Sequence, residues 1–289
     1  PLKSFSASNM QFTKMHGAGN DYIYVDATNS VERNWSSISV AMSDRHKGIG
    51  ADGLILAMLS KKSDIKMVMF NADGSEGKMC GNGIRCLVSF AMEQGIIPKD
   101  QPQVEVETLS GTRSVQPIWE NGIFTKARVG MGKPVLSANE IPVNIQGVNQ
   151  VMDHPIEVQD HDFLINCVSM GNPHAVAFVQ TPVSQIPLEQ IGPIVQNQHI
   201  FPEGINFEIV NVINKNKLEA RVWERGTGGT MACGTGACAI AVISQLKGFS
   251  GDKVEISLPG GKLNVEWDGV HEVVLEGPIT TVFNGEWHG

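Results

Sequence analysis

The stretch that decides the fold is Cys80-Gly81-Asn82-Gly83, and an almost wholly apolar run follows it as far as Gly95. The same pattern returns at Cys233-Gly234-Thr235-Gly236, whose apolar run ends at Gly248. Each block spans sixteen residues from its cysteine to its closing glycine, and the second block lies 153 residues after the first. A motif that repeats over this length indicates two copies of one structural unit.

Two further pairs of motifs repeat in the same order at nearly the same offset. Gly19-Asn20 matches Gly171-Asn172 after 152 residues, and each leads into a strand-like run. Leu109-Ser110-Gly111 matches Pro259-Gly260-Gly261 after 150 residues. Unrelated glycine turns would not keep one order and one offset, so we interpret the chain as an internal duplication.

Each half combines short strands with one apolar helix. Ile84–Glu93 and Ala237–Leu246 are apolar on almost every side, which predicts buried helices that end at Gly95 and Gly248. Runs rich in Val, Ile and aromatic residues predict strands at Tyr22–Val25, Gln103–Thr108, Phe124–Val129, Val168–Ser169, Ala175–Val179, Phe207–Ile213, Leu218–Trp223, Lys253–Ser257, Lys262–Trp267 and Glu272–Glu276. We therefore expect an α/β (α+β) fold of two pseudo-symmetric domains, each strand-rich around a buried helix and joined near Pro134–Pro142.

The composition limits the classes of function. The 289 residues, 42% hydrophobic and 18% charged, are typical of a soluble globular protein with two domains. A formal net charge of −8 without a basic run argues against a nucleic-acid surface, and no run approaches the roughly 18 apolar residues of a membrane span. Pro1–Asn9 lacks the apolar core of a signal peptide, so we expect a loose tail, a natural start near Met10 and a cytoplasmic location.

Five cysteines divide into two groups. Cys86 and Cys238 lie inside the apolar helices and Cys167 lies in a strand-like stretch, so packing is their expected role. In a reducing compartment free thiols are expected, and the spacing lacks the close cysteine pairs of a zinc site. Cys80 and Cys233 differ, because each directly precedes a helix within a glycine turn.

A thiol at a helix start is suited to proton transfer. Unpaired N–H groups and the helix dipole favour thiolate there, and the same N–H groups bind a carboxylate. Two such sites facing one amino acid would place a base on one side of its α-carbon and an acid on the other. No lysine motif indicates pyridoxal phosphate, and no strand–turn–helix glycine motif indicates a nicotinamide cofactor, so we expect no cofactor and no metal.

Six longer motifs resemble those of the diaminopimelate epimerase family. They are Met15-His16-Gly17-Ala18-Gly19-Asn20-Asp21, Phe70-Asn71-Ala72-Asp73-Gly74-Ser75-Glu76, Met79-Cys80-Gly81-Asn82-Gly83-Ile84-Arg85-Cys86, Ser169-Met170-Gly171-Asn172-Pro173-His174, Glu224-Arg225-Gly226-Thr227-Gly228 and Ala232-Cys233-Gly234-Thr235-Gly236-Ala237-Cys238. Their order and spacing match the pattern of this family from about Met10 to the C-terminal region. The resemblance implies cofactor-independent interconversion of LL- and meso-diaminopimelate in lysine biosynthesis, by an enzyme that is often a homodimer.

The resemblance also implies a domain plan. Each domain would be a strand barrel around a central helix, with the site in the cleft. The first domain would cover residues 10–133, the second 134–278, and a last strand at 279–289 would return to the first domain.

Site residues carry over from the resemblance by position. Cys80 and Cys233 would be the acid/base thiols, and the amides of Gly81, Asn82, Gly234 and Thr235 would hold the reacting carboxylate. The remaining substrate-binding residues implied are Asn20, Asn71, Asn172, Asn206, Glu224 and Arg225. His174 and Glu224 would tune the thiols.

Two positions depart from the commoner family pattern. Gly53 stands where many members have a glutamine that reaches the substrate, and Gly229 stands where many have glutamate. Neither change removes an acid/base group, but the contact made by that glutamine must be absent or replaced.

The residues leave two alternative functions open. A proline or hydroxyproline racemase of the same fold would share both cysteine turns, although such proteins usually carry histidine where this chain has Asn82, and proline has no second carboxylate for Arg225. A thiol redox sensor would also use thiolates at helix ends.

Overall fold

The computed structural model describes residues 9–30 and 32–288. The tail expected at Pro1–Asn9 therefore lies outside the described residues, except for Asn9. The chain forms two compact units: the first comprises Pro1–Gly17, Asp21–Ala127 and Ile279–Gly289, and the second comprises Ala18–Asn20 and Arg128–Pro278. The chain passes from the first unit to the second inside strand β8 (Ile123–Gly130).

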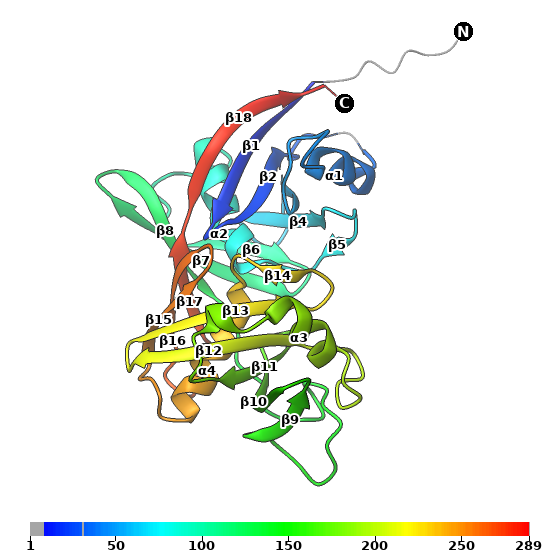
Figure 1. The fold of residues 1–289 in the computed structure, drawn as a ribbon. Helices are drawn as coiled ribbons and strands as arrows, with labels where there is room; N and C mark the ends of the chain where they lie inside the picture. The colour runs from blue at the N-terminus through cyan, green and yellow to red at the C-terminus, as the bar shows by residue number, and fades with distance from the viewer. Residues whose placement is uncertain (1–8, 31, 289) are drawn as a thin grey trace. The chain divides into compact units, whose positions relative to one another are not determined.

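The first unit is strand-rich. Its other elements are β1 (Met10–Gly17), β2 (Asn20–Asp26), α1 (Trp35–Ser43), β3 (Gly53–Met58), β4 (Ile65–Asn71), β5 (Glu76–Gly77), α2 (Gly81–Glu93), β6 (Val104–Thr108), β7 (Gly111–Glu120) and β18 (Thr280–Trp287). The C-terminal strand β18 pairs antiparallel with β1, and the two lie side by side in Figure 1. Strands β1 and β18 are thus neighbours in the sheet although they lie far apart in the sequence.

The second unit repeats this plan. It contains β9 (His154–Val158), β10 (His161–Ser169), β11 (Pro173–Phe178), the 3-10 helix η1 (Val183–Gln185), α3 (Leu188–Gln196), β12 (Asn206–Asn214), β13 (Lys217–Glu224), β14 (Gly228–Thr230), α4 (Gly234–Leu246), β15 (Lys253–Leu258), β16 (Gly261–Glu266) and β17 (Val274–Pro278). The segment expected as a linker belongs to this unit, because Val135 pairs with Ser169 and both Ala138 and Ile141 are buried in its core.

Strand register confirms the duplication in detail. In the first unit β2 runs parallel to β3, with Tyr22 opposite Gly53, and in the second unit β11 runs parallel to β12, with His174 opposite Asn206. Parallel neighbours need a crossover connection, and α1 and α3 lie on these crossovers. Gly53 and Asn206 are therefore equivalent positions of the two repeats, as are Tyr22 and His174.

The expectation of one helix in each half was incomplete, because α1 and α3 were missed. Helix α1 begins beyond Asn34, whose side chain accepts a hydrogen bond from the Ser37 amide, and it is rich in serine. Helix α3 contains Gly192 and Pro193, which ordinarily argue against a helix interior. Gly192 is needed here because a Cβ atom at this position would meet the Trp223 ring at 2.4 Å.

The predicted central helices α2 and α4 are the most regular part of the repeat. Both have thirteen residues and are almost fully buried, and both end before a glycine with positive φ, at Gly95 and Gly248. Helix α2 packs against β1, β3 and β7, while α4 packs against β10, β11, β12, β15 and β16. Strand β3 is buried on both faces, since α2 covers one side and α1 covers the other.

Candidate active site

Both cysteine turns fold into the same helix cap. Cys80 and Cys233 have extended backbone angles, with φ of −131° and −117°, and each is the N-cap of its helix. Cys80 Sγ accepts a hydrogen bond from the Gly83 amide at 3.3 Å, and Cys233 Sγ accepts one from the Gly236 amide at 3.3 Å. Each sulfur thus lies at the positive end of a buried helix, beside the amides expected to bind a carboxylate.

The two thiols have different surroundings. Cys80 is partly exposed, whereas the Cys233 residue is only 5% exposed. Burial raises the pKa of the Cys233 thiol well above its ordinary value, and the negative charges of Glu224 and Glu208 act in the same direction. Hydrogen bonds from Thr235 and the Gly236 amide oppose part of this shift, and the net rise in pKa favours the protonated thiol.

The amide turn beside Cys80 is held by a buried cation that sequence reasoning missed. Arg85 is fully buried, and its Nη1 and Nη2 atoms donate to Gly81 O at 2.9 Å and to Asn82 Oδ1 at 2.8 Å. Asn82 is also fully buried. Its side chain is therefore bound inside the helix turn by Arg85.

Asn172 and His174 lie in contact within the second unit. His174 Nε2 lies 3.0 Å from Asn172 Oδ1, and Asn172 Nδ2 donates to Thr235 Oγ1 at 3.2 Å. On its other side His174 Nδ1 lies 2.6 Å from Glu208 Oε1. Glu208 is the second residue that sequence reasoning missed.

Arg85 and Glu208 share a signal that could have found them. Each is a charged residue inside an otherwise apolar element, Arg85 in α2 and Glu208 in β12. A charge in such a place is rarely buried unless it has a specific partner.

Asn206 and Arg225 form one cluster. Asn206 is buried, its Oδ1 accepts from the Arg225 backbone amide at 2.8 Å, and its Nδ2 donates to Pro173 O at 2.8 Å. Arg225 is exposed, and its Nη1 donates to Glu203 O at 2.8 Å. Asn206 thus fixes the backbone from which Arg225 extends. Nearby in sequence, Glu224 Oε1 accepts from Thr230 Oγ1 at 2.8 Å.

The remaining expected asparagines are divided between the units. Asn71 belongs to the first unit, where its Nδ2 donates to Ser75 Oγ at 2.9 Å. Asn20 belongs to the second unit with Ala18 and Gly19. Gly260 must be glycine for this turn to pack, because a Cβ atom there would lie 2.0 Å from Ala18 O.

The two departures from the family pattern have different physical settings. At Gly53 a Cβ atom would lie 2.2 Å from Phe70 O, so β3 and β4 approach too closely for any side chain. At Gly229, which is exposed, a Cβ atom would meet only Glu189 Oε1, at 3.4 Å.

The other cysteines are buried, as expected for packing residues. Cys86, Cys167 and Cys238 are each at most 1% exposed. Burial raises the pKa of Cys86 to about 11 and raises that of Cys167 further still. Burial thus disfavours the thiolate form of Cys86 and Cys167.

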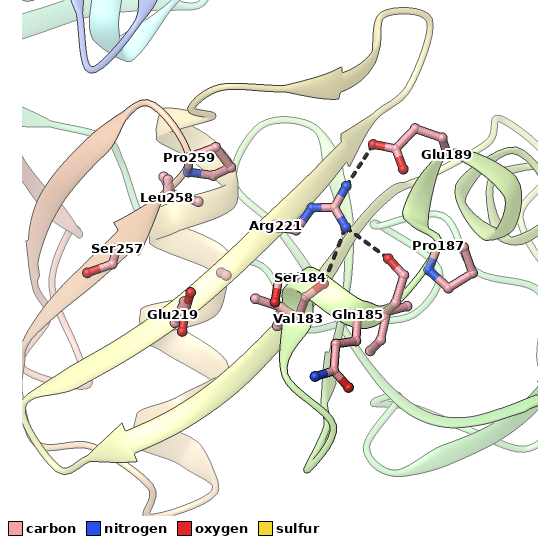
Figure 2. Close-up of a pocket in the computed structure, with 12 residues that line it drawn as sticks. Val183, Ser184, Gln185, Pro187, Glu189, Glu219, Arg221, Ser257, Leu258 and Pro259 are labelled. Atoms are coloured by element: carbon pink, nitrogen blue, oxygen red, sulfur yellow. Dashed lines mark hydrogen bonds and ion pairs between the residues drawn. The ribbon is translucent and has the colours of Figure 1, made fainter.

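A cavity of about 630 Å³ lies elsewhere in the second unit, between η1, α3 and β13 (Figure 2). Arg221 crosses it, donating through Nη1 to Val183 O and Ile186 O and through Nη2 to Glu189 Oε1. This guanidinium is used to hold η1 and α3 to the sheet.

Residues 9–30 and 32–288 contain no cluster of three or more His, Cys, Asp or Glu side chains arranged to hold a metal ion. Within the same ranges no helix has the length and apolar character needed to cross a membrane.

Comparison with known proteins identifies the family. The sequence profile described as diaminopimelate epimerase matches residues 12–137 and 166–282. A diaminopimelate epimerase of Methanococcus maripaludis is 47% identical over 96% of this chain and 99% of its own length, and one of Acetivibrio thermocellus is 46% identical over 96% and 98%.

Solved structures share the fold at low sequence identity. A PhzF-family phenazine biosynthesis protein of Bacillus anthracis has a TM-score of 0.67 at 15% identity, covering 97% of this chain and 99% of that one. A probable proline racemase of Agrobacterium radiobacter has a TM-score of 0.63 at 15% identity, covering 96% and 92%. Full-length identity above 40% and matching of both repeats show that this chain belongs to the diaminopimelate epimerase family, a family of isomerases.

Proposed function

We propose that the protein converts LL-diaminopimelate to meso-diaminopimelate with Cys80 and Cys233 as its two acid/base groups. The observation that carries the proposal is the repeated cap, in which each sulfur accepts a 3.3 Å hydrogen bond from the amide three residues later. A two-base inversion of one carbon uses a proton-transfer group on each face of that carbon, and the duplicated turn supplies two such groups. Relatives of nearly the same length bear the name diaminopimelate epimerase.

The two thiols would take opposite roles in each turnover. Cys80, the more exposed sulfur, acts as the thiolate that removes the α-proton, and its S–H bond forms as the C–H bond breaks. Cys233 acts as the thiol, and its proton goes to the opposite face of the carbanion. The first-turn amides of α2 and α4 stabilise the negative charge that develops on the α-carboxylate.

The second amino-acid head group would be bound by polar side chains. The exposed guanidinium of Arg225 can pair with the distal carboxylate through two parallel hydrogen bonds, while its Nη1 also donates to Glu203 O. Asn20, Asn71, Asn172 and Asn206 complete the proposed substrate set. His174 and Glu224 are proposed to tune the thiols, and the negative charge of Glu224 favours the protonated form of Cys233.

The setting of this activity is part of the same proposal. It is lysine biosynthesis in the cytoplasm, on a small-molecule substrate and without pyridoxal phosphate. A homodimer is also proposed, and the exposed Val282 and Phe283 of β18 provide an apolar strand surface for a second copy.

The test is proton exchange followed by NMR. LL-diaminopimelate is incubated in heavy water with reductant and with the native protein, Cys80→Ala or Cys233→Ala. Deuterium at the α-carbon together with accumulation of the meso form, and loss of epimerisation in both variants, is the expected result. Exchange of the α-proton of proline but not of diaminopimelate would show that proline, not diaminopimelate, is the substrate. Absence of α-proton exchange on both would favour the thiol redox sensor.

A further inference from the structure

A continuous chain of hydrogen bonds leads to Cys233 from a carboxyl group that the proposed mechanism does not use. Glu208 Oε1 lies 2.6 Å from His174 Nδ1, and His174 Nε2 lies 3.0 Å from Asn172 Oδ1. Asn172 Nδ2 donates to Thr235 Oγ1 at 3.2 Å, and Thr235 Oγ1 lies 3.4 Å from Cys233 Sγ. All five residues belong to the second unit.

Burial affects how many protons Glu208 and His174 hold together at the far end of this hydrogen-bond chain. The side chains of Glu208 and His174 are both 0% exposed. A net negative charge in such a place is costly, and Glu208 Oε2 has no hydrogen-bond partner among the described residues. Burial therefore favours a pair that is neutral overall, in which one proton is shared between Oε1 and Nδ1 across 2.6 Å. In either arrangement of that proton, His174 keeps a second hydrogen on Nε2.

This second hydrogen gives the chain a direction. His174 Nε2–H donates to Asn172 Oδ1, which turns the Asn172 NH₂ group toward Thr235. Because Thr235 Oγ1 already accepts that hydrogen bond, its own hydrogen is free to point at Cys233 Sγ. Every link then donates toward the sulfur.

We propose that Glu208 is a positioning residue, which keeps a hydrogen on His174 Nε2 so that Thr235 donates a hydrogen bond to Cys233 whenever that sulfur is a thiolate. The inference rests on the proposed role of Cys233, which becomes a buried thiolate each time it gives up its proton. The hydrogen bond from Thr235 offsets part of the cost of that buried charge.

The first unit provides an internal control. Strand register makes Ile55 the equivalent of Glu208 and Tyr22 the equivalent of His174, and Asn82 stands at the position of Thr235. Ile55 has no proton to share. Cys80 therefore has no equivalent chain, and changes along this chain should leave it unaffected.

The direct field of Glu208 would have the opposite effect on Cys233. A carboxylate near a thiol opposes its ionisation, and Glu208 faces Cys167, His174, Cys233 and Glu224. If Glu208 acted only through its charge, Glu208→Gln would make Cys233 ionise more easily. The hydrogen-bond chain predicts the reverse, because glutamine cannot share a proton with Nδ1. The imidazole can then place its single hydrogen on Nδ1, after which Asn172 turns and Thr235 donates to Asn172 instead of to sulfur.

The experiment measures the pH–rate profile of iodoacetamide alkylation at each cysteine, resolved by peptide mass spectrometry, without substrate. Glu208→Gln and Thr235→Val should each raise the Cys233 midpoint by about one pH unit, a roughly tenfold slower reaction at fixed pH. Thr235→Ser should keep the native midpoint. In the Thr235→Val background, Glu208→Gln should cause no further rise of the Cys233 midpoint. The pH–rate profile of Cys80 should be the same in every variant.

A measurement on the native protein avoids dependence on folded variants. Nitrogen-15 NMR of the His174 ring should show hydrogen on Nε2, and an Nε2 without hydrogen would overturn the proposal. A lower Cys233 midpoint in Glu208→Gln, an unchanged one, or an equal shift in the Thr235→Val background would also overturn it. Epimerase activity is measured separately. A native enzyme that is inactive on diaminopimelate would refute the proposed function, whereas the alkylation profiles would still test the hydrogen-bond chain from Glu208 to Cys233.

Discussion

Arg85 donates a 2.8 Å hydrogen bond from Nη2 to Asn82 Oδ1 inside the first turn of α2, and both side chains are completely buried. The same guanidinium donates to Gly81 O. This buried cation therefore orders the two residues whose amides are proposed to bind the reacting carboxylate.

Replacing Arg85 with methionine should damage both stability and catalysis. Asn82 Oδ1 and Gly81 O would lose their donor in a dry environment, which should lower the free energy of unfolding by about 2 kcal/mol. The value of kcat/KM should fall at least tenfold, because the amides would no longer be held in place. Urea unfolding and epimerase kinetics measure the two effects. Arg113→Met on β7 is the control, and equal losses in the two variants would count against a specific role.

Arg225 and Arg221 allow substrate binding to be separated from folding. Arg225→Met should lower kcat/KM roughly a hundredfold, mainly through KM, if its guanidinium pairs with the distal carboxylate. Arg221→Met should lower stability but leave KM unchanged, because its donors already bind Val183 O, Ile186 O and Glu189 (Figure 2). Steady-state kinetics with diaminopimelate measures KM and kcat/KM for both variants. An unchanged KM in Arg225→Met would remove Arg225 from the substrate site.

Gly53 should resist every substitution, including replacement by glutamine. Even alanine would place its Cβ atom 2.2 Å from Phe70 O, a backbone atom that cannot turn aside. Gly53→Ala should therefore lower the free energy of unfolding by about 1–3 kcal/mol, as overpacking does elsewhere. Thermal or urea unfolding measures this loss. Gly251→Ala is the control, because a Cβ atom there meets nothing within 4 Å. Equal stability of the two variants would show that β3 and β4 can separate at little cost.

The ion pair of Glu266 with Arg128 should make stability depend on acidic pH. Arg128 Nη1 and Nη2 lie 2.9 and 3.0 Å from the two oxygens of Glu266, and these bonds lower its pKa from 4.5 to about 2. The folded pKa lies below the unfolded one, so the stabilisation is complete above pH 4.5 and is lost as pH falls toward 2. Solvent screening at this part-exposed pair reduces the contribution to about 1–2 kcal/mol.

The test compares Glu266→Gln with the native protein by urea unfolding across a pH series. The variant should be less stable at pH 7 and should lose less stability between pH 4.5 and pH 2. Glu276→Gln is the control, since its carboxylate makes only a longer contact of 3.4 Å with Arg128. Parallel curves for the native protein and Glu266→Gln would contradict the assignment.

The repeat, the central helices and most strands could be predicted because their signals are local. The two Cys-Gly-x-Gly turns and the glycines at 95 and 248 mark the bounds of α2 and α4 within a few residues. Helix α3 could not be predicted in this way. Its Gly192 and Pro193 argue against a helix until Trp223 on β13 is seen to fill the space above Gly192.

Some site residues were also beyond local reasoning. Asn206 stays a proposed substrate ligand, but the sequence did not show that its side chain also binds Pro173 O and the Arg225 amide, which are close only after β11, β12 and β13 have paired. Gly53 looked like a missing contact, but pairing of β3 with β4 shows that no side chain fits there.

The sequence by itself determined the duplication, the two capped thiols and the family, because each is written in residues that are adjacent along the chain. Only the tertiary structure decided that the two thiols differ. Strand pairing brings Glu208 and His174 together in the buried interior of the second unit. In the first unit, which contains Cys80, the positions equivalent to Glu208 and His174 are Ile55 and Tyr22. Burial then raises the pKa of the Cys233 thiol, since a charge excluded from water depends on the groups that touch it.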